Sequence, residues 1–251
     1  MTGDAIRLAI GTLTRLPVPP PRTVDRRVAR GAMTLAPVVG LVLGAASAVV
    51  LALASRLATP SSLSSLLAST VVIAGLAYAT RALHLDGLAD TADALGSGKP
   101  REQALAIAKR SDIGPFGVIV LVLTLGLQIV ALALATERGI GIPAIVLAAV
   151  AGRVGLTWAC STPVPAARPD GLGALVAGTV SPWTAIAWTV VLVAAAALMG
   201  PGLLAGVAAG LATVAVFLRI AIRRLGGVTG DVLGAIVELA TTSVLVVAAV
   251  V

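Results

Sequence analysis

The sequence predicts an all-α protein, a polytopic integral membrane bundle of about seven transmembrane helices with a cytoplasmic N-terminus. Of its 251 residues, 58% are hydrophobic and only 12% are charged. Soluble domains carry about twice that share of charged residues. Several apolar runs also approach the length of about 20 residues that an α-helix needs to cross a bilayer. We therefore expect residues 1–251 to form a single membrane domain.

The predicted elements follow one another with short connections. Residues 1–34, a mildly amphipathic segment followed by prolines, are expected to lie in the cytoplasm or at the membrane interface. The expected spans are Leu35–Leu57, Leu63–Ala82, Pro115–Ala135, Ile142–Cys160, Pro182–Met199, Leu203–Ile220 and Val232–Val251. The longest hydrophilic connection, residues 83–114, is expected to face the cytoplasm. Within it, residues 101–111 have the apolar spacing of a short helix on the membrane surface, or of a solvated linker helix.

The distribution of Lys and Arg predicts the orientation. The connections after the first, third and fifth spans contain only Arg56 and Arg138 of the 18 basic residues. All the others lie in the N-terminal segment or in and around the connections after the second, fourth and sixth spans. The positive-inside rule places that side in the cytoplasm. This pattern also accounts for the net charge of +7, so that charge is not taken as evidence for nucleic-acid binding.

Composition excludes two further classes of protein. Aromatic residues make up 2% of the chain and no basic stripe has stacking residues between its charges, which argues against a nucleic-acid partner. Cys160 is the only cysteine, so no intramolecular disulfide framework exists. The expected partners are the lipid bilayer and small molecules. The sequence leaves open whether copies of the chain associate into a homo-oligomer.

Three acids stand close together in a chain that has only 11 carboxylates. Asp86, Asp90 and Asp93 are separated by four and three residues, so they share one stripe of an α-helix. No Lys or Arg lies at helical spacing to balance them. A divalent cation held by oxygen ligands, Mg²⁺ or Mn²⁺, would relieve the repulsion. The alternative is a polar helix end that projects into water.

Two more acids begin the last apolar run. Asp231 and Glu238 are seven residues apart, again on one stripe, and Glu238 would lie about 10 Å deeper in the membrane. A lone Glu at that depth needs a partner or a water-filled cavity. The preceding glycine-rich turn, with Gly227, Thr229 and Gly230, would offer backbone N–H groups and a helix N-terminus to a phosphate. Alternatively, the turn is an ordinary loop with Asp231 as the N-cap, which would not explain Glu238.

Some polar residues are weaker candidates for substrate binding. His84, the only histidine, should point away from Asp86, because two residues separate them on a helix. Arg153 either pairs with the acids or a phosphate, or extends toward the interface. Lys109, Arg110 and Ser111 either contact phosphate or form a solvated flank of a span. Acids on one face, a glycine turn and scattered Arg and Lys together indicate metal-assisted phosphoryl transfer.

The sequence resembles a known family, the cobalamin synthases or adenosylcobinamide-GDP ribazoletransferases. The similarity runs along nearly the whole chain. Its most specific part is the segment from His84 to Asp93, HLDGLADTAD, and it continues through Arg153, the turn GGVTGD at residues 226–231, and Glu238. Departures include Ala94, the order of charges around Ser111, and the absence of an acid shortly after Glu238.

The resemblance implies an activity in a late step of cobalamin biosynthesis. A ribose hydroxyl of α-ribazole, or of its 5′-phosphate, would attack the phosphoanhydride of adenosylcobinamide-GDP and release GMP, with Mg²⁺ as cofactor. By analogy Asp86, Asp90, Asp93 and Asp231 would bind metal, and Asp93 or Glu238 would act in catalysis, Asp93 being the favoured base. The family also implies a multi-pass protein of the bacterial cytoplasmic membrane whose active site faces the cytoplasm.

Two other functions remain open from the residues alone. A CDP-alcohol phosphotransferase also uses membrane-helix aspartates beginning Asp-Gly, but its motif continues with Ala-Arg, whereas this chain has Leu88, Ala89 and Asp90. A small-solute transporter would need ionisable residues near the bilayer midplane. Here only Glu238 is placed deep.

Overall fold

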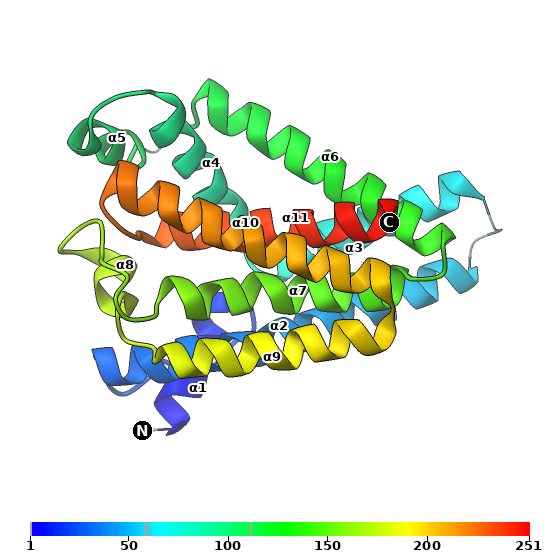
Figure 1. Cartoon of the computed structure of the whole chain (residues 1–251), viewed down its shortest axis with the longest axis horizontal. Coiled ribbons are helices and arrows are strands. Elements are labelled where there is room, and N and C mark those ends of the chain that lie inside the picture. The colour runs from blue at the N-terminus through cyan, green and yellow to red at the C-terminus, as the bar shows by residue number, and fades with distance from the viewer. Residues whose placement is uncertain (1, 58, 60, 111) are drawn as a thin grey trace.

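The protein is described by a computed structural model that covers residues 2–57, 59, 61–110 and 112–251. Over these residues it consists of helices and two isolated β-bridges, and the long helices lie side by side along the longest axis (Figure 1). In chain order the helices are α1 Thr2–Leu13, α2 Arg26–Leu57, α3 Ser62–Ala79, α4 Leu83–Gly96, α5 Arg101–Ile107, α6 Pro115–Glu137, α7 Gly141–Ala159, α8 Gly171–Val176, α9 Pro182–Met199, α10 Pro201–Leu225 and α11 Gly230–Val250.

The predicted class and span count are confirmed, because seven helices are long and apolar enough to cross a membrane: α2, α3, α6, α7, α9, α10 and α11. Their bounds differ most from the prediction at two places, and by at most three residues elsewhere. Helix α2 begins at Arg26, where Asp25 Oδ1 accepts a hydrogen bond of 2.7 Å from the Val28 N–H. Helix α10 extends to Leu225 and ends at Gly226, whose φ of 82° suits glycine. Both extensions carry arginines, which the hydropathy pattern had assigned to loops.

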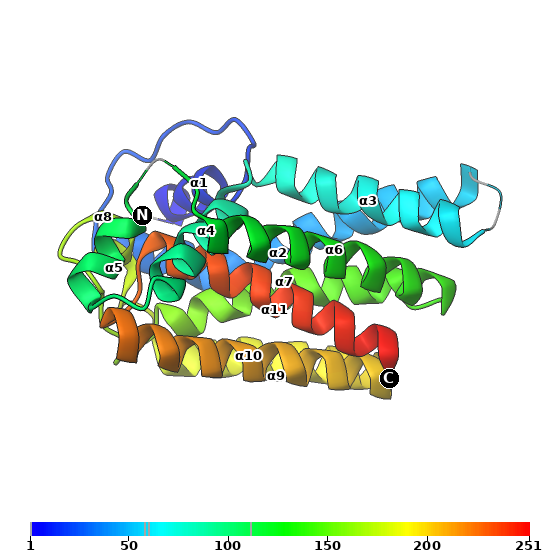
Figure 2. The same cartoon turned by 90° about the horizontal axis from the view of Figure 1, so that it is seen from above.

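The chain crosses the bundle back and forth, and the short helices gather at one end of it. Figures 1 and 2 agree that α1, α4, α5 and α8 lie together at this end, far from the C-terminus. We call it the polar end. Arg56, in the last turn of α2, and Arg138, which follows α6, lie toward the opposite end. The unequal distribution of Lys and Arg along the sequence therefore corresponds to a difference between the two ends of the bundle.

Helices α7 and α11 form the centre of the bundle. In each, 72% of the apolar window is buried, against 17–39% in the other spans. Small residues allow the close packing that membrane helices use in place of a hydrophobic driving force. At Gly206 of α10, an added Cβ would lie 2.7 Å from the Val244 carbonyl oxygen of α11. Helix α11, which carries Asp231 and Glu238, is thus fixed on several sides.

A tight left-handed turn directs α4 away from α3. Arg81 and Ala82 have φ values of 57° and 53°, in a region that non-glycine residues rarely adopt. The Arg81 guanidinium donates a hydrogen bond of 2.7 Å to the Gly11 carbonyl oxygen in α1. The following helix, α4, carries the acidic stripe. The predicted short helix after it is confirmed as α5.

Candidate functional site

Helices α4 and α11 cross at very close range beside the acidic residues. An added Cβ at Gly87 would lie 2.7 Å from the Asp231 carbonyl oxygen, and one at Gly234 would lie 3.0 Å from the His84 carbonyl oxygen. Only glycines permit this approach of the two backbones. The crossing brings the stripe that begins at Asp86 next to the start of α11. The two acidic segments, which are distant in the sequence, therefore converge as predicted.

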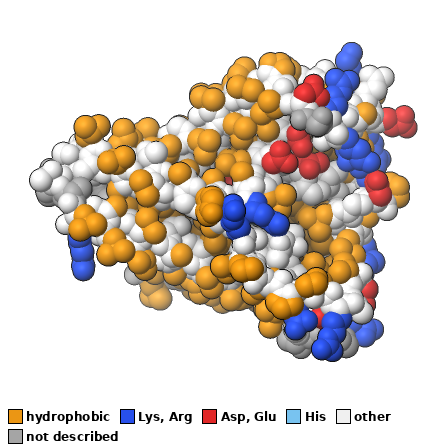
Figure 3. Space-filling view, turned by 180° about the vertical axis from the view of Figure 1, so that it is seen from behind, with side chains coloured by type: hydrophobic (Ala, Val, Ile, Leu, Met, Phe, Trp, Pro, Cys, Tyr) orange, Lys and Arg blue, Asp and Glu red, His pale blue; other side chains and the backbone are white. Residues whose placement is uncertain are grey.

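The carboxylates at the crossing influence one another electrostatically. Asp86 is exposed, Asp90 is half-buried, and Asp231 is half-buried on the facing helix. Partial burial, followed by the charges of Asp86, Asp231 and Asp93, raises the pKa of Asp90 to about 6, while Arg168 opposes the shift. Figure 3 shows acidic side chains gathered near the polar end of an otherwise largely hydrophobic face. These acids therefore form one repulsive cluster, here called the acidic crossing.

Thr229, and not Asp231, is the N-cap of α11. Thr229 Oγ1 accepts a hydrogen bond of 3.2 Å from the Val232 N–H and donates one of 3.2 Å to Asp231 Oδ2. The ordinary explanation of Asp231 as a helix cap is therefore wrong. The Asp231 side chain lies at the crossing and has no capping role.

Asp93 has a contact that the sequence did not predict. Its Oδ2 accepts a hydrogen bond of 2.7 Å from the Gly114 N–H, and its Oδ1 accepts one of 3.0 Å from the Gly117 N–H. Both donors belong to the start of α6, so this buried carboxylate caps a neighbouring helix and faces its positive dipole end. Asp93 thereby joins α4 to α6.

Replacing Asp93 should therefore lower stability as well as activity. Hydrogen bonds to charged groups contribute roughly 1.5–3 kcal/mol each, so Asp93→Ala is expected to cost about 3 kcal/mol or more. Thermal unfolding of the purified protein in detergent measures this loss, with Asp112→Ala, an exposed acid two residues before Gly114, as the control. An Asp93→Ala protein of wild-type stability that has lost only turnover would instead assign Asp93 to the chemistry.

A second polar group lies under the crossing, inside the bundle. His84, Gln128, Arg153 and Glu238 line a cavity of about 10 Å³, which is about the space that one water needs. Gln128 Nε2 donates hydrogen bonds of 2.8 Å to Glu238 Oε2 and 3.0 Å to Thr242 Oγ1.

Two members of this group are buried with unpaired nitrogens. Within the described residues, both ring nitrogens of His84 and Nε and Nη2 of Arg153 have no hydrogen-bond partner. Burial, followed by the Arg153 charge, lowers the pKa of His84 well below its usual value. A bridging water or substrate group is needed to satisfy these nitrogens.

The glycine turn before α11 is packed on one side. The Val228 N–H donates a hydrogen bond of 3.0 Å to the Pro165 carbonyl oxygen, and the Ala167 N–H donates one of 2.9 Å to the Val228 carbonyl oxygen. Arg101 lies against Gly226 and donates a hydrogen bond of 2.8 Å to the Ala167 carbonyl oxygen. These contacts hold the segment that contains Gly227, Thr229 and Gly230 rigidly at the start of α11.

Within the described residues, neither Lys109 nor Arg110 forms an ion pair with an acid of the crossing. Lys109 makes an exposed ion pair of 3.1 Å with Asp170, which lowers the pKa of Asp170, and Arg110 is exposed. Ser111 lies outside the described residues. Arg168, one of the basic residues that predict the cytoplasmic side, lies close enough to lower the pKa of Asp90. Its position between two prolines in the loop before α8 was the only available signal.

The acidic crossing offers carboxylate oxygens, which are the ligands that a hard divalent cation prefers. Among the residues that the structure describes, no three His, Cys, Asp or Glu side chains form a ready-made metal group. Mg²⁺ commonly binds through one or two carboxylates together with waters and substrate phosphates, and not in an all-protein cage. Exposed and half-buried carboxylates that repel one another fit that mode of binding.

Comparison with known proteins assigns a family. Residues 5–249 match the family model described as cobalamin-5-phosphate synthase. A protein of Frankia casuarinae named adenosylcobinamide-GDP ribazoletransferase is 42% identical over 97% of this chain and 93% of its own length. Proteins of the same name from Nocardioides sp. and Bradyrhizobium diazoefficiens are 43% and 40% identical, over 96% and 97% of this chain and 96% and 92% of theirs. No solved structure matches.

Proposed function

Because the chain belongs to the cobalamin-5-phosphate synthase family, we propose that it is a membrane transferase that joins α-ribazole, or its 5′-phosphate, to adenosylcobinamide-GDP. A ribose hydroxyl of the acceptor attacks the phosphorus on the corrinoid side of the phosphoanhydride. The new P–O ester bond forms, the anhydride bond breaks, and GMP leaves. The product is adenosylcobalamin or its 5′-phosphate.

The observation that carries this proposal is the close crossing of α4 and α11. It brings Asp86 and Asp90 against Asp231 at the polar end, outside the apolar part of the bundle. A diphosphate needs positive charge around its oxygens and a fixed position relative to the attacking hydroxyl. The convergence of acids there supports binding of Mg²⁺, which would neutralise the diphosphate when bound.

The residues at the crossing take three roles, and one of the metal-binding acids also accepts a proton. Asp86, Asp90 and Asp231 would hold Mg²⁺, while Arg168 would contact the phosphate oxygens from the facing loop. The acceptor's hydroxyl proton needs a carboxylate within hydrogen-bond reach. Since Asp93 already accepts two backbone N–H groups and Glu238 lies two helical turns deeper than Asp231, we assign proton acceptance to Asp86 or Asp90.

The buried polar group beneath the crossing has a positioning role. Glu238 supplies the negative charge that Arg153 needs inside the bundle. Gln128 fixes the Glu238 carboxylate, and His84 belongs to the helix that carries the acidic stripe. This group therefore brings side chains of α4, α6, α7 and α11 around one cavity behind the acids.

Turnover by the purified protein tests the proposed function. With adenosylcobinamide-GDP, α-ribazole and Mg²⁺ in detergent or vesicles, GMP should be released in proportion to the cobalamin formed. Absence of GMP release would refute the proposal. Release of CMP from a CDP-alcohol would favour the phospholipid-enzyme alternative, and solute uptake by vesicles would favour a transporter.

We also propose that the polar end faces the cytoplasm of a bacterial inner membrane. Lys99 lies in the connection after α4 and Arg101 begins α5, and the positive-inside rule keeps such charge in the cytoplasm. An alkaline phosphatase moiety fused after Gly98 should therefore be inactive, while a green fluorescent protein fused there should fluoresce. The opposite pair of signals would invert the topology.

A further inference from the structure

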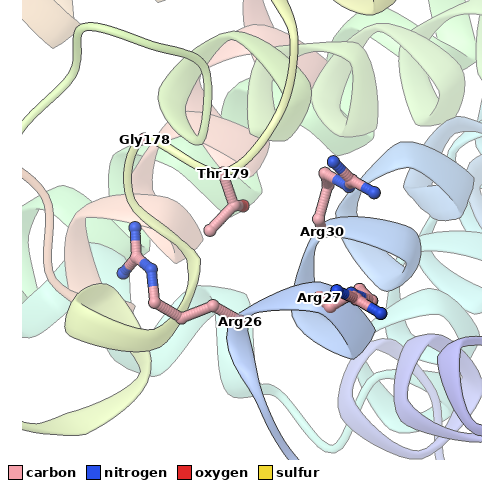
Figure 4. A pocket seen from close by; sticks show the side chains of 5 residues that line it. All are labelled: Arg26, Arg27, Arg30, Gly178 and Thr179. Carbon is pink, nitrogen blue, oxygen red and sulfur yellow. The ribbon is translucent and has the colours of Figure 1, made fainter.

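A basic cavity at the polar end lies apart from the acidic crossing. It has a volume of about 470 Å³ and is lined by Arg26, Arg27, Arg30, Gly178 and Thr179. Figure 4 shows that the three arginines come from the start of α2 and that Gly178 and Thr179 come from the loop after α8. Arg27 and Arg30 are exposed and lie one helical turn apart, so their charges repel.

The cavity wall is held in place by hydrogen bonds. Arg26 donates one of 2.5 Å to the Ala174 carbonyl oxygen and one of 2.6 Å to the Ala177 carbonyl oxygen, which pins the end of α8 to α2. Thr179 donates its N–H to the Cys160 carbonyl oxygen at 2.9 Å. With Arg26 committed to the wall, Arg27 and Arg30 supply the free charge. No carboxylate pairs with either of them within the described residues.

The surroundings of the cavity favour an amphiphilic ligand. Trp183, at the start of α9, is 77% exposed, as is typical of aromatic residues at the headgroup level of a bilayer. Beyond it, α2 and α9 expose apolar side chains, including Leu41, Val42 and Val190. Basic pockets between transmembrane helices at the membrane surface bind anionic lipid headgroups. A phosphate diester could thus sit between the arginines while its acyl chains lie along these two helices.

We propose that Arg27 and Arg30, beside Thr179, form a binding site for the phosphate of an anionic phospholipid, separate from the site of phosphoryl transfer. The two guanidinium groups donate to the phosphate oxygens. Thr179 forms part of the cavity wall, and its hydroxyl donates a hydrogen bond of 2.6 Å to the Val176 carbonyl oxygen. A lipid bound at this site would contact the polar end of the bundle on the side of α2 and α9.

Native mass spectrometry of the purified protein tests this site. After incubation with equal amounts of phosphatidylglycerol and phosphatidylcholine, wild-type protein should retain phosphatidylglycerol selectively. Arg27→Gln combined with Arg30→Gln should weaken that retention by about fivefold per arginine. The matched control is Arg223→Gln with Arg224→Gln, which removes the same charge from exposed positions at the same end and should retain the lipid. Equal retention in the two double variants would overturn the proposal.

A second arm separates a lipid phosphate from the phosphate of a substrate. Turnover is measured with α-ribazole and with α-ribazole 5′-phosphate. If the cavity binds lipid, the Arg27→Gln, Arg30→Gln variant changes KM for both acceptors to the same extent or not at all. A rise in KM confined to the phosphorylated acceptor, with lipid retention unchanged, would assign the cavity to substrate and refute the lipid site. The charge-conserving Arg27→Lys, Arg30→Lys variant should retain most of the lipid, which guards against a folding defect.

Discussion

Asp90→Asn is expected to reduce turnover by roughly a hundredfold or more, because charge neutralisation by a metal supplies several kcal/mol of transition-state stabilisation. The substitution is nearly isosteric and removes one negative charge from the middle of the acidic crossing. That removal also relieves the repulsion from Asp86, Asp231 and Asp93. Helix content and thermal stability should therefore be unchanged or slightly higher while activity is lost.

The comparison of activity with stability makes this result decisive. GMP release and thermal unfolding are measured on the same preparations of wild type, Asp90→Asn and Asp112→Asn. Asp112 is an exposed acid beside α6 and serves as the charge-matched control. Turnover of Asp90→Asn within a few-fold of wild type would remove Asp90 from the proposed metal site. An equal loss in Asp112→Asn would show that net charge alone is responsible.

Gly87→Ala should have a comparably large effect without changing any polar group. The new Cβ would lie 2.7 Å from the Asp231 carbonyl oxygen and 2.9 Å from its Cα. Because both contacts are with backbone, α4 and α11 must move apart. Displacements of about 1 Å can cost a hundredfold in rate, and overpacking costs about 1–3 kcal/mol in stability. We expect a loss of turnover with a modest fall in the unfolding temperature.

Gly75→Ala is the matched control for this substitution. Gly75 lies within α3, and a Cβ added there meets no atom within 4 Å. Alanine favours a helix over glycine by about 1 kcal/mol, so this variant should be at least as stable as wild type and fully active. If Gly87→Ala behaved in the same way, the close approach of α4 and α11 would have no functional importance.

Hydropathy was sufficient to predict the number of spans. Seven apolar runs became seven helices because a bilayer allows few other ways to satisfy the backbone. The ends of α2 and α10 were missed because their arginine-rich turns look like loops when only hydropathy is considered. A helix can continue past the apolar zone wherever a side chain such as Asp25 caps it.

The acidic crossing was predictable because four- and seven-residue spacings show which carboxylates share a helix face. The partners of those carboxylates were not predictable. Asp93 caps α6 from a position more than twenty residues earlier in the chain, so no local pattern reveals the contact. Arg168 approaches Asp90 through a loop whose path depends on tertiary packing. The left-handed turn at Arg81 and Ala82 contains no glycine, asparagine or proline to indicate it.

Binding of Mn²⁺, measured by electron paramagnetic resonance in the presence of adenosylcobinamide-GDP, tests the central claim most directly. If carboxylates from α4 and α11 share one cation with the diphosphate, Asp90→Asn and Asp231→Asn should each weaken Mn²⁺ binding by about tenfold or more, while Asp112→Asn should not. Wild-type Mn²⁺ affinity in both Asp90→Asn and Asp231→Asn would contradict the account.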